Sequence, residues 1–349
     1  MHVKRTIAAA LATVTVLVVG ADSPAQADRT RHDPVVSPLA TIPGGLGSGS
    51  TIGPDGALYV TDGNGDGTSG GVLRIDRRSG HVTPYASGLP RQVLGIGGAM
   101  DVAFLGRTAY VLVTMVGGDL LQPGGPVPFG NATNGIYRIN RDGTSSLVAD
   151  IGAFAAANQP TGFDYFITTG VQYAMQPYRG GFLVTDGHHN RVLRVTLDGH
   201  VSEFATFDNV APTGLERSGN TVYVAEAGIV PHVSQDARIV AFTHRSSTPT
   251  VVASGSPGDE AGLAVDVERG PRHGLYALLQ GVWDHENIPG NAGMPASPNS
   301  GELVKVTSEG TFAPVVGSLD QPTSMEIVGD TAYVVSLTGA VTRIDHISG

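Results

Sequence analysis

Most of this chain consists of short runs rich in Val, Ile, Leu and Tyr, in which apolar and polar positions alternate. Gly, Pro, Asn and Asp separate the runs, which is typical of short antiparallel strands joined by turns. Helical spacing of apolar residues is almost absent after the amino-terminal segment, and the Ala-rich stretch Ile151–Ala157 is too short to predict a helix. The pattern therefore predicts an all-β protein.

A repeated phrase divides this pattern into units. Leu58–Gly63 (Leu-Tyr-Val-Thr-Asp-Gly) precedes Val72–Ile75, and the same pair returns as Phe182–Gly187 and Val192–Val195. Such self-similarity indicates a repeat architecture. Six predicted second strands share the Tyr-Val pattern, and they are Leu58–Thr61, Ala109–Val113, Phe182–Thr185, Val222–Ala225, Leu275–Leu278 and Ala332–Val335. The six third strands that follow them are Val72–Asp76, Ile136–Asn140, Val192–Thr196, Arg238–Phe242, Glu302–Thr307 and Ala340–Asp345.

Outer strands complete all units but the last. They are Val82–Ser87, Ser146–Ile151, Val201–Phe207, Thr250–Ser254 and Phe312–Gly317. The missing outer strand is found at the other end of the chain, where Val36–Thr41 resembles the outer strands in sequence. A ring of blades closed in this way leaves no open sheet edge. We therefore predict a six-bladed β-propeller over residues 35–349, in which the amino-terminal strand closes the carboxy-terminal blade.

The two faces of such a ring differ. When the strands of a blade are named a to d from the centre outward, the a–b and c–d turns share one face, and the b–c loops and d–a linkers share the other. Several b–c loops are long, notably 115–135, 227–237 and 281–301. Long loops on a rigid scaffold usually carry binding, so we expect the functional site on this loop face. The linkers 159–162, 211–214 and 321–324 are expected to lead into innermost strands, and the insertion Asp164–Arg179 is expected on the opposite, turn face.

The amino terminus has the pattern of an export signal. Lys4 and Arg5 precede the apolar run Ile7–Ala21, and Ala25-Gln26-Ala27 matches a cleavage site. We expect residues 1–27 to be removed, residues 28–34 to form a flexible tail, and the protein to be secreted. The chain contains no cysteine, which excludes disulfides and thiolate chemistry, and its net charge of -10 gives nucleic-acid binding no electrostatic basis.

A calcium-loop pattern is the sharpest local motif. Asp62, Asn64 and Asp66 place three oxygen-bearing side chains at alternating positions before Gly67, as a D-x-N-x-D-G loop does. Leu73 stands where an EF-hand needs its bidentate Glu, so an EF-hand is excluded. Calcium binding completed by other groups and a tight Asx turn without metal both remain open.

Other candidate residues lie at strand ends and in the loops. Asp62, Asp186 and Glu226 end equivalent b strands, where they either surround a metal ion or cap their own turns. Asp101 belongs to an innermost strand and is a channel candidate. The remaining ligand-binding candidates come from b–c loops, and they are His188, His189, His232, Trp283 and His285. Solvated histidines and a tryptophan that only anchors its loop are the alternatives.

A family resemblance rests on Gly53–Asp62, Gly70–Ile75, Gly98–Phe104 and Asn190–Val195. These segments resemble the ScyD/ScyE family of exported six-bladed propellers, and the Gly-Pro-Asp-Gly-x-Leu-Tyr-Val phrase is similar to that of NHL-repeat, SMP-30-like gluconolactonase and streptogramin-lyase propellers. The resemblance implies the fold and export but no defined catalytic set. Lactonase-type propellers hold a divalent cation with Glu, Asn and Asp, and this chain has no Asn at its b-strand ends.

Two functions follow as hypotheses. The first is a secreted monomer that binds a small molecule, glycan or protein through its loop face, with calcium as a candidate structural ion. The alternative is a metal-dependent hydrolase or lyase with a cluster of carboxylates at the channel mouth. Whether the protein is an enzyme stays open, because a propeller hosts both classes.

Overall fold

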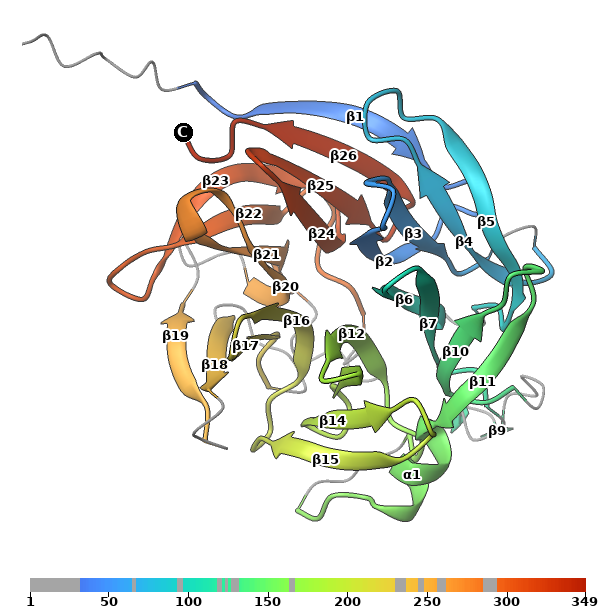
Figure 1. The fold of residues 1–349 in the computed structure, drawn as a ribbon. Coiled ribbons are helices and arrows are strands. Elements are labelled where there is room, and N and C mark those ends of the chain that lie inside the picture. The colour runs from blue at the N-terminus through green and yellow to red at the C-terminus, as the bar shows by residue number, and fades with distance from the viewer. Residues whose placement is uncertain are drawn as a thin grey trace, which may run out of the picture. The chain divides into compact units, whose positions relative to one another are not determined.

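Six four-stranded antiparallel sheets follow one another in a ring, so the chain forms a six-bladed β-propeller, as the sequence predicts (Figure 1). The computed structural model describes residues 32–64, 67–92, 97–117, 121–122, 125–126, 132–162, 167–229, 237–243, 248–255, 262–284 and 294–349. Residues 33–349 form one compact unit.

The first three blades are formed by consecutive segments of chain. Blade 1 contains β2 (Gly47–Ile52), β3 (Leu58–Asp62), β4 (Gly70–Ile75) and β5 (Val82–Leu89). Blade 2 contains β6 (Gly98–Leu105), β7 (Thr108–Thr114), β10 (Gly135–Ile139) and β11 (Ser145–Asp150), and a small hairpin of β8 (Leu121–Gln122) and β9 (Gly125–Pro126) lies between β7 and β10 in the chain. Blade 3 contains β12 (Gln172–Tyr178), β13 (Gly181–Asp186), β14 (Arg191–Thr196) and β15 (Val201–Thr206).

The other three blades complete the ring. Blade 4 contains β16 (Pro212–Ser218), β17 (Thr221–Glu226), β18 (Arg238–Thr243) and β19 (Thr250–Ser254). Blade 5 contains β20 (Gly262–Arg269), the short 3-10 helix Pro271–His273, β21 (Leu275–Gly281), β22 (Gly301–Val306) and β23 (Phe312–Leu319). Blade 6 contains β24 (Pro322–Val328), β25 (Thr331–Ser336), β26 (Ala340–Asp345) and β1 (Val35–Thr41). The innermost strands β2, β6, β12, β16, β20 and β24 contact one another around the centre.

The ring is closed by the two ends of the chain. Strand β1 pairs antiparallel with β26, from Val35 opposite Asp345 to Thr41 opposite Ala340. The predicted closure by the amino-terminal strand is thus confirmed, and β26 has no open edge in blade 6.

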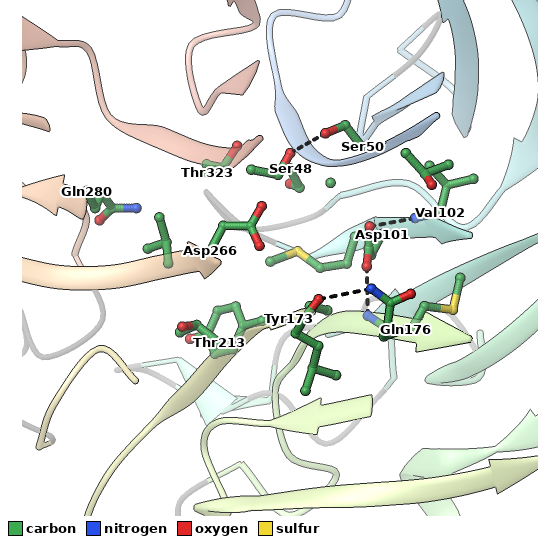
Figure 2. Close-up of a pocket in the computed structure, with 18 of the residues that line it drawn as sticks. Ser48, Ser50, Asp101, Val102, Tyr173, Gln176, Thr213, Asp266, Gln280 and Thr323 are labelled. Carbon is green, nitrogen blue, oxygen red and sulfur yellow. Dashed lines mark hydrogen bonds between the residues drawn. The ribbon is translucent and has the colours of Figure 1, made fainter. Parts of the chain in front are cut away.

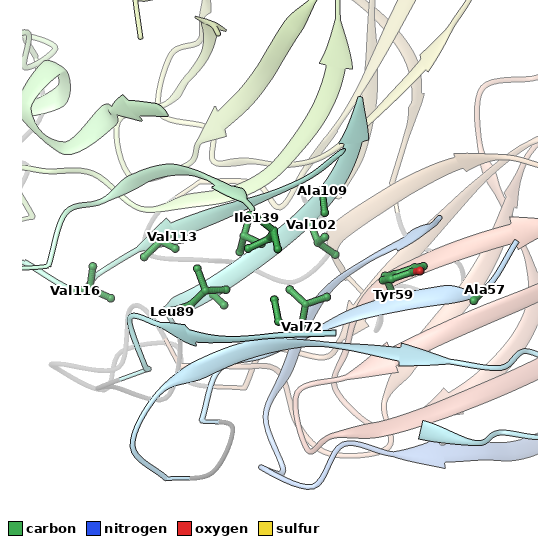
Figure 3. Close-up of a cluster of buried hydrophobic side chains, with 12 residues drawn as sticks. Ala57, Tyr59, Val72, Leu89, Val102, Ala109, Val113, Val116 and Ile139 are labelled. Atoms are coloured by element: carbon green, nitrogen blue, oxygen red, sulfur yellow. The ribbon is translucent and has the colours of Figure 1, made fainter. Parts of the chain in front are cut away.

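The repeated phrase is buried because each blade packs between two others. Every residue of β3 and β13 is buried. Between blades 1 and 2, Tyr59 contacts Phe104 edge-on at 4.8 Å between ring centroids. Tyr59, Val72 and Val113 belong to one buried cluster that runs along these two blades (Figure 3). Two buried faces explain why apolar residues follow one another directly in Leu58–Val60 and Phe182–Val184, before the polar strand ends.

Threonine hydroxyls add polar links between neighbouring blades. Thr185 Oγ1 in blade 3 donates to the Thr213 carbonyl oxygen of blade 4 at 2.7 Å, and Thr213 Oγ1 lies 2.6 Å from the Ala264 carbonyl oxygen of blade 5. The Pro-Thr-Gly linker of blade 4 therefore has a structural role, because its Thr connects two inner strands.

Two expectations about residues 151–179 are wrong. Ile151–Ala157 forms helix α1, whose first turn is capped by Asp150 Oδ1 accepting from the Ala153 N–H at 2.7 Å. The cap compensates for the helix's short length. The innermost strand of blade 3 begins at Gln172 rather than after residue 162, so residues 167–171 belong to the d–a linker on the loop face.

The strand register explains this second error. Gly187 N–H donates to the Val171 carbonyl oxygen at 2.9 Å, just as Ala227 N–H donates to the Ala211 carbonyl oxygen at 2.9 Å. Val171 therefore corresponds to Ala211, and Gln172 takes the place of the linker proline.

In the part of the chain that the structure describes, no helix is long and apolar enough to cross a membrane.

Removal of β1 tests the closure. A chain that begins at Ile42 leaves the β26 edge unpaired, whereas a control chain that begins at Asp33 keeps the pairing. A loss of a few kcal/mol lowers the melting temperature by roughly 5–10 °C in a domain of this size, and an unpaired edge promotes association. Thermal melting and light scattering should show both effects in the shorter chain alone. Equal melting temperatures and monomeric behaviour of both chains contradict the closure.

Candidate functional site

A pocket of about 170 Å³ lies at the centre of the ring and is lined by the innermost strands of all six blades (Figure 2). Met294, Pro295 and Leu337 also line it, and these residues belong to b–c loops. The pocket therefore extends to the loop face, which is the face that the sequence analysis associates with binding.

Asp101 is built into the wall of this pocket by two backbone hydrogen bonds. Its Oδ1 accepts from the Val102 N–H of β6 at 2.8 Å, and its Oδ2 accepts from the Met175 N–H of β12 at 2.7 Å. The side chain is buried, with 8% of the residue exposed. Asp101 thus links blade 2 to blade 3 while it lines the pocket.

Asp266 repeats this arrangement in blade 5, three blades around the ring. Its Oδ1 accepts from the Val267 N–H at 2.8 Å, and its Oδ2 accepts from the Met325 N–H of blade 6 at 2.8 Å. Both aspartates follow a register shift in their strands, at Ala99/Asp101 and at Ala264/Asp266. Figure 2 shows the two carboxyl groups on separate inner strands beside the same pocket.

A glycine of the preceding blade makes room for each aspartate. A Cβ atom on Gly49 of blade 1 would lie 2.3 Å from Asp101 Oδ1. A Cβ atom on Gly214 of blade 4 would lie 2.7 Å from Asp266 Oδ1 and 2.5 Å from its Cα. The ring therefore contains two matching sets of three neighbouring blades, each with a Gly, an Asp and a Met N–H in the same relation.

Burial dominates the electrostatics of these carboxyl groups. It raises the pKa of Asp101 well above its usual range, against the two N–H bonds, and the charge of Asp266 adds to the rise. Burial likewise raises the pKa of Asp266 to about 7, with a further contribution from the charge of Glu216. Both groups therefore favour the protonated form more than an exposed aspartate does.

Two glutamates extend the acidic wall. Glu268 and Glu326 line the same pocket, and burial followed by repulsion from neighbouring carboxylates raises the pKa of each well above its usual range. No Lys, Arg or His is among the described residues that line the pocket. The four carboxyl groups of the pocket therefore all favour the protonated form more than exposed carboxyl groups do, and no basic residue is among its described lining.

Asp186, a sequence candidate, lies in a buried ion pair. Its Oδ2 accepts from Arg191 Nε at 3.0 Å and lies 3.1 Å from His189 Nδ1, and its Oδ1 accepts from Gln172 Nε2 at 3.1 Å. Arg191 also contacts Glu203 Oε1 at 3.0 Å. Asp186 and His189, predicted separately, are therefore brought together, with Arg191 as a partner that the sequence analysis missed.

Glu226 occupies the same position in blade 4. It faces Arg238 across β17 and β18, as Asp186 faces Arg191, and the two side chains form an ion pair. Burial raises the pKa of Glu226, while Arg238 opposes the rise. Neither Glu226 nor Asp186 lines the central pocket, so the structure places them in a different environment from Asp101.

His188 and Trp283 have buried polar contacts with the loops. His188 Nε2 accepts from the Ile167 N–H at 3.1 Å, and burial, reinforced by His189, lowers the pKa of His188 to about 4. Trp283 is 2% exposed and its Nε1 donates to the Met294 carbonyl oxygen at 3.0 Å. Because Met294 lines the pocket, Trp283 holds part of the pocket mouth in place.

Asp62 and Asn64, two of the three candidate calcium residues, form a turn at the end of β3. Asp62 Oδ1 accepts from the Asn64 N–H at 3.2 Å, which is an Asx turn. Asp66, His232 and His285 lie outside the described residues. Within the described ranges, no group of three or more His, Asp or Glu side chains is arranged to hold a metal ion.

Sequence analysis identified Asp101 but not Asp266, Glu268 or Glu326. The signal was present, because Gly98–Val102 (Gly-Ala-Met-Asp-Val) corresponds to Gly262–Val267 (Gly-Leu-Ala-Val-Asp-Val). With Gly97 included, the two segments align without a gap, and the same register shift precedes each aspartate.

The close approach of glycine and aspartate gives a stability prediction. Gly214→Ala should force β16 away from Asp266 and lower the free energy of unfolding by about 1–3 kcal/mol, as overpacking does. Gly317→Ala is the matched control, because a Cβ atom there meets only Glu302 Oε1 at 3.9 Å. Chemical denaturation measures both. Equal stability of the two variants contradicts the close contact.

Comparisons with known proteins agree with the fold. The gluconolactonase of Xanthomonas campestris aligns with a TM-score of 0.56 at 14% identity over 90% of each chain. The virginiamycin B lyase of Staphylococcus aureus aligns with a TM-score of 0.51 at 14% identity over 90% of this chain and 99% of that one. The PQQ-bound aldose sugar dehydrogenase of Streptomyces coelicolor aligns with a TM-score of 0.53 at 14% identity over 90% of this chain and 98% of that one. No family model and no curated protein matches this chain. At these identities the similarity shows a shared propeller fold.

Proposed function

We propose that this propeller binds a small, positively charged ligand in its central pocket, which the ligand enters from the loop face. The observation that carries the proposal is a pocket with four acidic residues, Asp101, Asp266, Glu268 and Glu326, and no basic residue among those described. A cationic group gains Coulomb energy with the ionised forms of these carboxyl groups, of which Asp101 is buried and the other three are half-buried. An anion is repelled by each of these groups that is ionised.

The rest of the lining suits an organic cation better than a bare ion. Met100, Met175 and Leu263 supply apolar surface, and Gln176 and Thr213 supply amide and hydroxyl groups. A mixed lining with a few polar groups is typical of small-molecule sites. The ligand class is therefore an aliphatic amine or a similar cation with an apolar body.

Cation binding in this pocket is coupled to protons. A bound cation favours the ionised carboxyl groups, so binding releases protons that the empty pocket holds. With the pKa of Asp266 raised to about 7, affinity should increase as pH rises through 7.

A matched set of four-carbon probes tests the ligand class. Putrescine should raise the melting temperature, whereas butanediol and succinate should not, and a ligand present at 100 times its Kd stabilises by about 2.7 kcal/mol. Glu326→Gln should weaken putrescine binding by about tenfold, which is the loss of one partly buried charge contact of about 1.4 kcal/mol. Glu309→Gln, on an exposed turn outside the pocket, is the control. Equal stabilisation by all three probes, or equal weakening in both variants, contradicts the proposal.

Catalysis is the second candidate, and the protonated carboxyl groups favour it. A carboxylic acid kept neutral near pH 7 in a ligand-sized pocket can act as a general acid. The named activities of two similar structures, a gluconolactonase and a virginiamycin B lyase, suggest lactone hydrolysis or lyase chemistry as the first assays. Turnover that Asp101→Asn abolishes without loss of folding supports an enzyme. A metal-dependent mechanism needs ligands beyond the described residues.

The proposal also includes the cellular setting expected from the sequence. We propose export after removal of residues 1–27, supported by the three-part signal pattern, and action as a monomer, which the paired edge of the closing blade favours. ScyD/ScyE-like propellers are the proposed relatives, on the segments that resemble that family.

Calcium remains part of the proposal as a structural ion at Asp62, Asn64 and Asp66. The support is the spacing of these residues in the turn after β3. We expect about one calcium ion per purified chain, and a chelator should lower the melting temperature of the wild type but not of Asp66→Ala. Elemental analysis without calcium, together with an unchanged melt, removes this part of the proposal.

A further inference from the structure

Five of the six c strands carry a basic side chain at the same position, close to the end of the strand that leads into the c–d turn. The residues are Arg74, Arg138, Arg194, Lys305 and Arg343. In blade 1, Arg74 Nε pairs with Asp55 Oδ2 at 2.7 Å, and in blade 6, Arg343 pairs with Asp345 at 2.9 Å. In these two blades the cation therefore has a nearby carboxylate as its partner.

Blade 3 differs from blades 1 and 6 at this position. Arg194 donates only to backbone carbonyl oxygens, namely those of Phe182 at 3.2 Å, Arg179 at 3.0 Å and Val195. These bonds fix the guanidinium group but leave its charge without a counterion. Among the described residues, no Asp or Glu side chain forms an ion pair with Arg194.

Two further arginines join Arg194 around one aromatic ring. The guanidinium carbons of Arg179, Arg194 and Arg217 lie 5.1, 5.4 and 6.0 Å from the centroid of the Tyr178 ring. Tyr178 is itself held by an edge-on contact with Phe204 at 5.7 Å. Elsewhere in the described chain, Tyr223, Tyr276 and Tyr333 each have one cation over the ring.

Among the described residues, no carboxylate forms an ion pair with any of these three arginines. Arg179 and Arg217 are exposed, and their guanidinium groups donate no hydrogen bond to any described residue. Burial, together with the charge of Arg179, lowers the pKa of Arg194 despite the favourable effect of Tyr178. Cation–π contacts of about 0.5–1 kcal/mol at exposed sites do not remove repulsion among three like charges, so an anion is the missing partner.

One carboxyl group lies close by, and it does not fill this role. Glu216 Oε2 accepts from the backbone N–H of Arg217 at 2.8 Å and from Gln176 Nε2 at 3.3 Å. Burial raises the pKa of Glu216 to about 7, against the opposing charges of Arg269 and Arg217. Glu216 is thus directed toward backbone and amide groups and is partly neutral at physiological pH.

We propose that Arg179 and Arg217, arranged over Tyr178 and backed by Arg194, bind the phosphate or sulfate group of an anionic ligand on the turn face. A tetrahedral oxyanion accepts hydrogen bonds from several guanidinium groups at once, which is why arginine is preferred at such sites. None of the four residues lines the central pocket, so the site is independent of the function proposed above.

An NMR titration of the whole protein at low ionic strength tests the site. Sodium phosphate and sodium sulfate are added in parallel, with sodium chloride at equal ionic strength as the reference. We expect saturable shifts of the Tyr178 ring and of the Arg179 and Arg217 side-chain signals with phosphate, sulfate or both, and none with chloride. The tighter of the two anions identifies the group that the site accepts.

Matched variants locate the effect. Arg179→Gln and Arg217→Gln should each weaken binding by about tenfold, since each removes one charge-assisted contact. Arg141→Gln is the control, because Arg141 is exposed on the c–d turn of blade 2, away from Tyr178. Glu216→Gln should strengthen binding by removing the nearby negative charge. Linear, unsaturated shifts with all three salts, or equal weakening by Arg141→Gln, overturn the proposal.

Discussion

The hydrogen bonds from inner-strand N–H groups to the Asp101 and Asp266 carboxyl groups are the interaction on which the centre of this propeller depends. Each aspartate accepts one bond from its own strand and one from the next blade, and each fits against a glycine of the preceding blade. Three consecutive blades are therefore held by one side chain. Because blades 1–3 and blades 4–6 contain the same arrangement, the central pocket has an approximate two-fold pattern.

The free-energy cost of burying these carboxyl groups gives the pocket its unusual pKa values. A buried carboxylate loses hydration that two N–H bonds restore only in part. The raised pKa of Asp101, Asp266, Glu268 and Glu326 expresses that loss. Apolar side chains could pack the blades together without this loss of hydration. Perturbed carboxyl groups gathered in a cavity are characteristic of binding and catalytic sites, which is why the centre is the functional candidate.

The other acidic residues show a different solution to the same problem. Asp186 and Glu226 end neighbouring b strands, and each has an arginine opposite it on the c strand. Their charges are satisfied locally by Arg191 and Arg238. The position of an acid in the repeat is therefore not enough to assign its role, because the residue across the strand pair decides whether the charge is neutralised.

The sequence predicted the blades well because strand alternation and repetition are local properties. The closing strand and nearly all strand positions followed from them. The helix α1 was missed, since a cap at Asp150 rather than length stabilises it. The start of β12 was misplaced because Gln172 replaces the proline of the related linkers. Asp266 was missed although its segment matches the one containing Asp101 and has the same register shift, because only the folded ring places both residues at one pocket.

A pH titration of the side-chain carboxyl carbons by NMR tests the central claim most directly. Buried carboxyl groups that link the blades should titrate above the ordinary aspartate value of 3.8, with Asp266 near pH 7 and Asp101 also well above its usual range. The exposed Asp142 should titrate below 3.8, because Thr144 hydrogen-bonds to its ionised form. Titration of Asp101 and Asp266 at or below 3.8 would show that the channel holds fully ionised carboxylates, which contradicts the account.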